Sequence, residues 1–174
     1  MIKFTEAEVV FSEIPDEITL AINISNCQNN CIGCHSPHLR QNVGEELTTE
    51  VLDNLVENNA GITCVCFMGE GKDELALQNL IAHLHQNYPS IKIGLYSGRE
   101  EVLEDFYWQV LDYLKIGPYM PEFGPINEET TNQRLYGRKE GMITAVFGPI
   151  TGETRYRYQW QDITEKFWRN ETLH

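Results

Sequence analysis

Strand-like apolar runs alternate with amphipathic helical segments between residues 18 and 116, and this alternation restricts the fold more than any other feature of the sequence. The predicted elements are, in order, strand 18–24, helix 48–58, strand 62–68, helix 73–88, strand 91–96, helix 99–109 and strand 111–116. The helices are predicted from apolar residues at a spacing of 3.6, and the strands from short, nearly continuous apolar runs. The order βαβαβαβ predicts an α/β fold with a parallel sheet.

The number of predicted strands indicates an open sheet. A full eightfold barrel needs about 250 residues, whereas the chain has 174. We therefore expect an open partial (β/α) barrel. Residues 117–125 hold three prolines and are predicted to be irregular and to cross the mouth of this barrel. In the helix predicted at 99–109, Val102, Leu103 and Phe106 are expected to face inward.

A β-hairpin is predicted near the C-terminus. Residues 142–147 and 154–160 flank the turn-forming segment 148–152, and aromatic and polar residues alternate in the second arm. We expect residues 1–136 to form the main domain and residues 137–174 to form a C-terminal extension packed on that same domain.

The charge of the chain excludes several classes of partner. With 13 Lys and Arg against 26 Asp and Glu, the formal net charge is −13, which disfavours binding to nucleic acid or to anionic membranes. No apolar run approaches the roughly 18 residues that span a bilayer. The first twenty residues carry five acidic side chains, which is wrong for a signal peptide. We expect a cytoplasmic protein.

Three of the five cysteines lie within eight residues. Cys27, Cys31 and Cys34 follow the predicted strand 18–24 with the spacing C-x3-C-x2-C, in a loop rich in turn-forming residues. An odd number of cysteines without an export signal argues against a disulfide framework. Clustered thiols at the carboxyl end of a strand predict a metal site, because ligands of α/β proteins bind at that end.

The number of thiols favours iron over zinc. Structural zinc takes four ligands, normally from two separated pairs, and no second pair follows in this sequence. Three thiolates on one loop suit a 4Fe-4S cluster that leaves one iron open to a further ligand. The alternative of a tetrahedral zinc site stays open, because His35 or the distant Cys64 could supply a fourth ligand.

The cysteine spacing resembles the cluster loop of the radical S-adenosylmethionine superfamily. Within that superfamily, Cys34-His35-Ser36-Pro37 and Thr131-Asn132-Gln133-Arg134 are similar to segments of the activating proteins of anaerobic ribonucleoside-triphosphate reductases. The similarity covers roughly residues 12 to 136, so the predicted hairpin extension lies outside it.

The resemblance implies a cofactor pair and a reaction. Cys27, Cys31 and Cys34 would ligate three irons of a 4Fe-4S cluster, and the amino and carboxylate groups of S-adenosylmethionine would chelate the fourth. An electron from the cluster would split the cofactor into methionine and a 5′-deoxyadenosyl radical. In this family the radical removes hydrogen from a glycine of the partner reductase. A low-potential donor such as flavodoxin is implied, and no side chain is assigned to the chemical step itself.

Further residues are expected to line the cofactor. The resemblance implies this role for Gly33, Cys34 and His35. Gly69 and Glu70 stand where superfamily members often carry a Gly-Gly-Glu turn that receives the amino group of the cofactor, although Met68 replaces the first glycine here. Ser97 stands where the family contacts ribose or adenine; the alternative is a helix N-cap.

Other polar and cysteine positions have less specific expectations. Cys64 and Cys66 are predicted to be buried small hydrophobic residues on one face of a strand. Asp112 and Lys115 have opposite parity, so only one can face the interior, and we expect a solvated pair at the edge. The polar run 132–134 is either plain surface or a cofactor or partner contact.

Two other functions are consistent with the cysteine motif. One is a radical S-adenosylmethionine enzyme acting on a small substrate, similar to the deazaguanine synthases. The other is a zinc or iron-sulfur interaction module without turnover.

Overall fold

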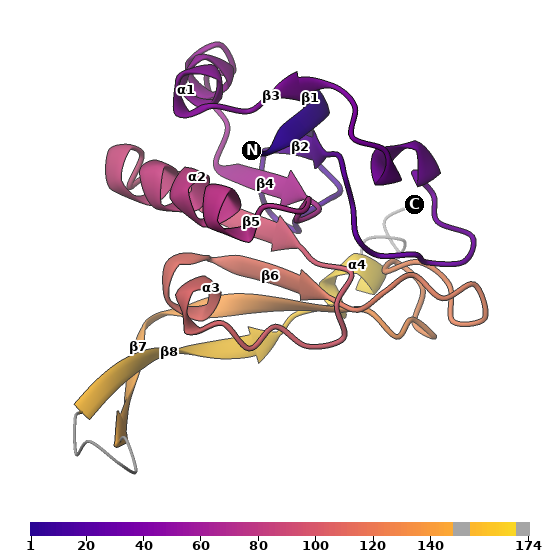
Figure 1. Cartoon of the computed structure of the whole chain (residues 1–174). Helices are drawn as coiled ribbons and strands as arrows, with labels where there is room; N and C mark the ends of the chain where they lie inside the picture. The colour runs from indigo at the N-terminus through magenta and orange to yellow at the C-terminus, as the bar shows by residue number, and fades with distance from the viewer. Residues whose placement is uncertain (148–153, 170–174) are drawn as a thin grey trace.

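One mixed sheet of eight strands runs through the part of the chain that the structure, a computed structural model, describes, which is residues 1–147 and 154–169 (Figure 1). The order of the strands across the sheet is β3-β1-β2-β4-β5-β6-β7-β8. Their bounds are β1 Lys3–Val10, β2 Thr19–Ile24, β3 Glu45–Glu46, β4 Cys64–Met68, β5 Lys92–Tyr96, β6 Tyr113–Ile116, β7 Arg134–Phe147 and β8 Thr154–Asp162.

The centre of the sheet is parallel, as the alternating sequence pattern predicts. Strands β2, β4, β5 and β6 pair in parallel, whereas β1, β3, β7 and β8 join their neighbours antiparallel. The two outermost strands, β3 and β8, do not pair with each other. The prediction of an open α/β sheet is therefore confirmed. Strand β1, a solvent-facing strand next to the edge of the sheet, was not predicted from the sequence.

Three helices lie on one face of this sheet (Figure 1). The helical segments are η1 Pro37–Arg40, α1 Thr49–Glu57, α2 Glu74–Asn87, α3 Asp105–Val110 and α4 Lys166–Arg169. Thr48 is the N-cap of α1, and its hydroxyl accepts from the Val51 amide; Asp73 is the N-cap of α2, and its carboxylate accepts from the Ala76 amide. The larger core lies between the sheet and α1, α2 and α3, and contains Phe67, Leu77 and Ile81.

A second, smaller core lies on the opposite face of the sheet. It contains Ile14, Cys64, Cys66 and Leu135, all fully buried, with Phe167 of α4 packed against it. The prediction that Cys64 and Cys66 are buried small hydrophobic residues is confirmed. Burial raises the pKa of both thiols, which keeps them protonated and unreactive.

The C-terminal hairpin is present and belongs to the same sheet. Strand β7 pairs with β6 on one side and with β8 on the other, so the expected boundary at residue 136 falls within β7. The indole of Trp160 on β8 packs edge-to-face on Trp108 of α3, with ring centroids 5.0 Å apart. The predicted turn at 148–152 lies outside the described residues.

Two local predictions are wrong. The helix expected at 99–109 is shorter, because α3 begins only at Asp105, and Leu103 is 79% exposed rather than inward. The solvated pair of Asp112 and Lys115 is not found, since Lys115 is only 7% exposed and faces the smaller core. Across residues 1–147 and 154–169, no helix has the length and apolar character needed to cross a membrane.

Candidate functional site

The cysteine loop begins where β2 ends. The loop is held by backbone hydrogen bonds to the segment around η1: the Asn26 amide donates to the Gln41 carbonyl at 2.9 Å, and the Cys27 amide donates to the Leu39 carbonyl at 3.0 Å. Asn26 has a left-handed backbone with φ 61°, which turns the chain sharply away from the strand. All three cysteines of the loop are free and partly exposed.

A cavity of about 500 Å³ opens beside this loop, at the carboxyl ends of the parallel strands. Such a volume lies in the range of small-molecule sites. The residues that line it include Cys27, Gly33, Cys34, His35, Gly69, Tyr96 and Lys115. Four of the predicted cofactor-binding residues therefore lie around one cavity, although they come from separate parts of the chain.

The segment 117–125 covers one side of this cavity, as expected for a crossing over the mouth of the sheet. Tyr119 and Pro125 line the cavity, and an added Cβ at Gly33 would lie 3.1 Å from the Pro121 ring. Since Gly33 also has φ +69°, only glycine satisfies both the backbone conformation and the close approach.

The polar run 132–134 holds the crossing segment in place. Asn132 Nδ2 donates to the Pro118 carbonyl at 2.9 Å, and Gln133 Nε2 donates to the Gly117 carbonyl at 3.3 Å. Gln133 is buried and also lines the cavity. These side chains thus shape the cavity rather than form plain surface.

Lys115 brings a buried positive charge into the cavity. Its ammonium donates to the Gly117 carbonyl at 2.8 Å and lies 5.7 Å from the centre of the Tyr96 ring. No carboxylate pairs with it in residues 1–147 and 154–169. Burial lowers its pKa to about 8. Such an ammonium suits a ligand with a carboxylate.

Arg40 brings a second cation to the cysteine loop. Its guanidinium donates to the Cys31 carbonyl, and its buried Nε finds no hydrogen-bond partner. The side chain also lines the cavity. Nothing in the sequence motif singled out Arg40, because its contact with Cys31 depends on the path of the chain between them.

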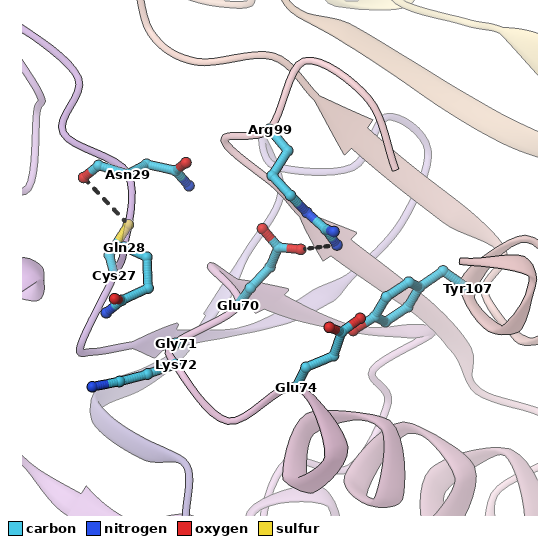
Figure 2. A pocket seen from close by; sticks show the side chains of 9 residues that line it. All are labelled: Cys27, Gln28, Asn29, Glu70, Gly71, Lys72, Glu74, Arg99 and Tyr107. Carbon is cyan, nitrogen blue, oxygen red and sulfur yellow. Dashed lines mark hydrogen bonds and ion pairs between the residues drawn. The ribbon is translucent and has the colours of Figure 1, made fainter. Parts of the chain in front are cut away.

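Glu70 and Ser97 lie outside the main cavity and contact each other. The Ser97 hydroxyl donates to Glu70 Oε2 at 2.8 Å and accepts from the Arg99 amide at 3.0 Å. Glu70 pairs with Arg99 and lines a smaller pocket of about 180 Å³, which shares Cys27 with the main cavity (Figure 2). Ser97 therefore caps a local turn, while helix α3 begins only after Glu104.

The three thiols of the loop are not drawn together. No group of three or more His, Cys, Asp or Glu side chains able to hold a metal ion is found in the described ranges. Cys27 and Cys34 both line the cavity, whereas Cys31 is not among its lining residues. In chemical terms the donor set fits an iron-sulfur cluster: one loop carries three soft sulfur ligands free of disulfides, and two of them line a cavity with a buried ammonium. A cluster would have to draw the three thiols toward one another.

Comparison with known proteins identifies no relative of this chain. No family model matches the chain, and neither a curated protein nor a solved structure matches it.

Proposed function

We propose that the chain is a radical S-adenosylmethionine enzyme of the open partial-barrel type, which generates a glycyl radical on an anaerobic ribonucleoside-triphosphate reductase. The observation that carries the proposal is the position of the cysteine loop, at the carboxyl ends of four parallel strands and beside a 500 Å³ cavity. The resemblance of Cys27, Cys31 and Cys34 to the superfamily motif supports the same reading.

The residues divide into two groups under this proposal. Cys27, Cys31 and Cys34 would hold the 4Fe-4S cluster, and the cavity would hold S-adenosylmethionine. A reduced cluster held by these cysteines would supply the electron for reductive cleavage of S-adenosylmethionine. The protein contributes position and electrostatics, as it does in other cofactor enzymes.

The Lys115 ammonium would bind the carboxylate of the methionine moiety. A charge-assisted hydrogen bond in a buried site is stronger than one in water, and no protein carboxylate within the described ranges competes for this ammonium. Its position would fix which end of the cofactor lies at β6. Gly69, with φ +116°, would offer its backbone to the cofactor without a side chain in the way.

The apolar lining of the cavity would protect the radical. Met68, Tyr119, Pro125 and Ile126 line it together with the polar residues, and with the cofactor bound they would keep water from the reacting atoms. The glycine of the reductase must reach this cavity before the radical reacts elsewhere. A low-potential protein such as flavodoxin would deliver the electron at the exposed cysteine loop.

The decisive test is anaerobic reconstitution with iron and sulfide, followed by reduction in the presence of S-adenosylmethionine. The intact protein should be brown, contain about four irons per chain and release 5′-deoxyadenosine. Cys31→Ala should lose the iron and the release of 5′-deoxyadenosine. The matched control is Cys64→Ala, which removes a buried thiol away from the loop and should retain both.

The remaining alternatives give different results in the same experiment. A colourless protein that binds one zinc ion would contradict the proposal and favour an interaction module. Release of 5′-deoxyadenosine with a nucleobase precursor, and no radical on the reductase in electron paramagnetic resonance spectra, would favour a small-substrate enzyme. Full iron content in Cys31→Ala would contradict the ligand assignment.

A further inference from the structure

A second hollow, which we call the aromatic groove, lies between α3 and the β7–β8 hairpin. Its volume is about 620 Å³. The residues that define it here are Glu101, Leu103, Trp108, Tyr136, Tyr158 and Trp160. None of them takes part in the cavity described above, and the proposed reaction leaves this groove without a role.

The tryptophans of the groove are fixed in position. Trp108 packs edge-to-face on Trp160 and on Tyr136, with ring centroids 5.0 Å and 5.9 Å apart. Both indole N–H groups are already used, since Trp108 donates to the Val102 carbonyl at 2.7 Å and Trp160 donates to the Trp108 carbonyl at 3.0 Å. The groove therefore offers ring faces and edges rather than hydrogen-bond donors, and ordering these rings costs a ligand little entropy.

The rim of the groove is apolar and negatively charged. Leu103 is 79% exposed, and Glu101 forms no ion pair within residues 1–147 and 154–169. One face of Tyr158 is already taken by the Arg138 guanidinium, which lies 4.4 Å from the ring centre and pairs with Asp112, so Trp108, Trp160 and Tyr136 are the rings left for a ligand. Aromatic faces beside an unpaired carboxylate are complementary to a lysine or arginine side chain flanked by aliphatic residues.

The groove lies directly behind the cavity. Consecutive residues of a strand point to opposite faces of the sheet, and in β6 Lys115 lines the cavity whereas Ile116 lines the groove. The chain then continues from Ile116 into the segment 117–125, which covers the cavity. A protein segment held in the groove would therefore contact the strand that leads directly into the cover of the cavity.

We propose that the aromatic groove is the docking site for an extended segment of a partner protein that carries a basic residue next to aliphatic ones. The inference rests on the function proposed above, which makes this partner the anaerobic reductase. Charge complementarity at Glu101 and the fixed aromatic surface select such a segment over an acidic or purely polar one.

The test compares four single variants for affinity to the purified reductase, measured anaerobically by biolayer interferometry at low and high salt. Leu103→Glu and Glu101→Lys change exposed groove residues and should each weaken binding at least tenfold. Leu75→Glu and Glu8→Lys are the matched controls, because Leu75 is 68% exposed on α2 and Glu8 is exposed on β1. These controls should stay within twofold of the unaltered protein. The loss with Glu101→Lys should shrink as salt increases.

A second measurement separates docking from chemistry. Release of 5′-deoxyadenosine without the reductase should be the same in all four variants and in the unaltered protein. Unchanged reductase affinity in Leu103→Glu and Glu101→Lys would overturn the docking site and leave the proposed function standing. If the unaltered protein neither binds the reductase nor releases 5′-deoxyadenosine, both proposals fail. If Leu103→Glu converts a dimer to a monomer in sedimentation and still binds the reductase, the groove contacts a second copy instead.

Discussion

The Arg99 guanidinium lies 2.5 Å from Glu70 Oε1, and this ion pair joins the turn after β5 to the turn after β4. A second carboxylate, Glu104 Oε1, lies 2.8 Å from the same guanidinium. The Arg99 guanidinium thus pairs with two carboxylates, and the Ser97 hydroxyl donates a hydrogen bond to that of Glu70. These contacts fix the carboxyl ends of two parallel strands that border the cysteine loop (Figure 2).

Arg99→Met should destabilise the fold by about 1–2 kcal/mol, because it leaves two partly buried carboxylates without their counter-charge. The matched control is Arg169→Met, which removes an exposed i,i+4 pair with Glu165 and should cost less than about 0.5 kcal/mol. Urea denaturation at neutral pH measures both. Equal midpoints for the two variants would show that the Arg99 network does not support these turns.

Lys115→Met should raise stability at pH 7 by about 2–3 kcal/mol, since it removes the cost of burying an ammonium. The pKa of Lys115 is lowered from 10.5 to about 8, so between these values the unfolded chain binds the extra proton. The stability of the unaltered protein should therefore rise with pH from about 8 to 10.5 relative to that of the variant.

Thermal or urea denaturation between pH 7 and pH 10.5 checks this prediction. Lys72→Met, at an exposed lysine, should keep the pH-dependent rise of the unaltered protein. A constant stability difference between Lys115→Met and the unaltered protein over the whole pH range would contradict the assignment. Under the proposed function, Lys115→Met should also weaken S-adenosylmethionine binding at pH 7 by tenfold or more.

Gly98→Ala should disturb the cysteine loop from a position outside it. An added Cβ at Gly98 would lie 2.8 Å from Asn29 Cγ and 3.2 Å from Asn29 Cβ, so the Asn29 side chain of the cysteine loop must shift. We expect a stability loss of about 1–2 kcal/mol and less iron retained after reconstitution. Asn29→Gly in the same chain should restore iron content, whereas Asn29→Gly alone should leave it unchanged. Failure of this rescue would refute the steric coupling.

Arg40→Gln should make a bound cluster harder to reduce, because a nearby positive charge stabilises the more negative, reduced state. Arg40→Lys keeps the charge and should stay close to the unaltered protein. A redox titration followed by electron paramagnetic resonance measures the two potentials. If the reduction potential shifts equally in Arg40→Gln and Arg40→Lys, the hydrogen bond to the Cys31 carbonyl sets the potential, and the charge of Arg40 does not.

The central architecture could be predicted because its signals are local. The apolar period of 3.6 in residues 73–88 and the buried run 62–68 each follow from neighbours in the chain, and the cysteine spacing lies within eight residues. Helix α3 could not be predicted as well, because distant groups keep residues 99–104 out of the helix. The Gly117 amide donates to the Arg99 carbonyl at 2.7 Å, and the Arg99 side chain is held by Glu70.

The site could be predicted from the sequence only in part, because it too depends on contacts between distant parts of the chain. The parity of β6 showed that Asp112 and Lys115 face opposite sides, but both faces of the sheet carry apolar residues, so the pattern could not say which face lines a cavity. Leu114 packs in the larger core and Tyr113 beside the smaller one. The position of Lys115 depends on the side that the helices cover, which is a property of the whole sheet.

The strict alternation of Lys115 and Ile116 has a consequence for how the chain can change over evolution. Sliding β6 by one residue along β5 would place the ammonium among the indoles and the isoleucine in the cavity. An insertion or deletion inside this strand therefore damages both the cavity and the aromatic groove in a single step, and the two residues before it offer no relief, because Leu111 is fully buried and Asp112 is bonded to Ile93 and Arg138. Length variation among descendants of this sequence should accordingly spare the four residues of the strand and the two residues that precede it.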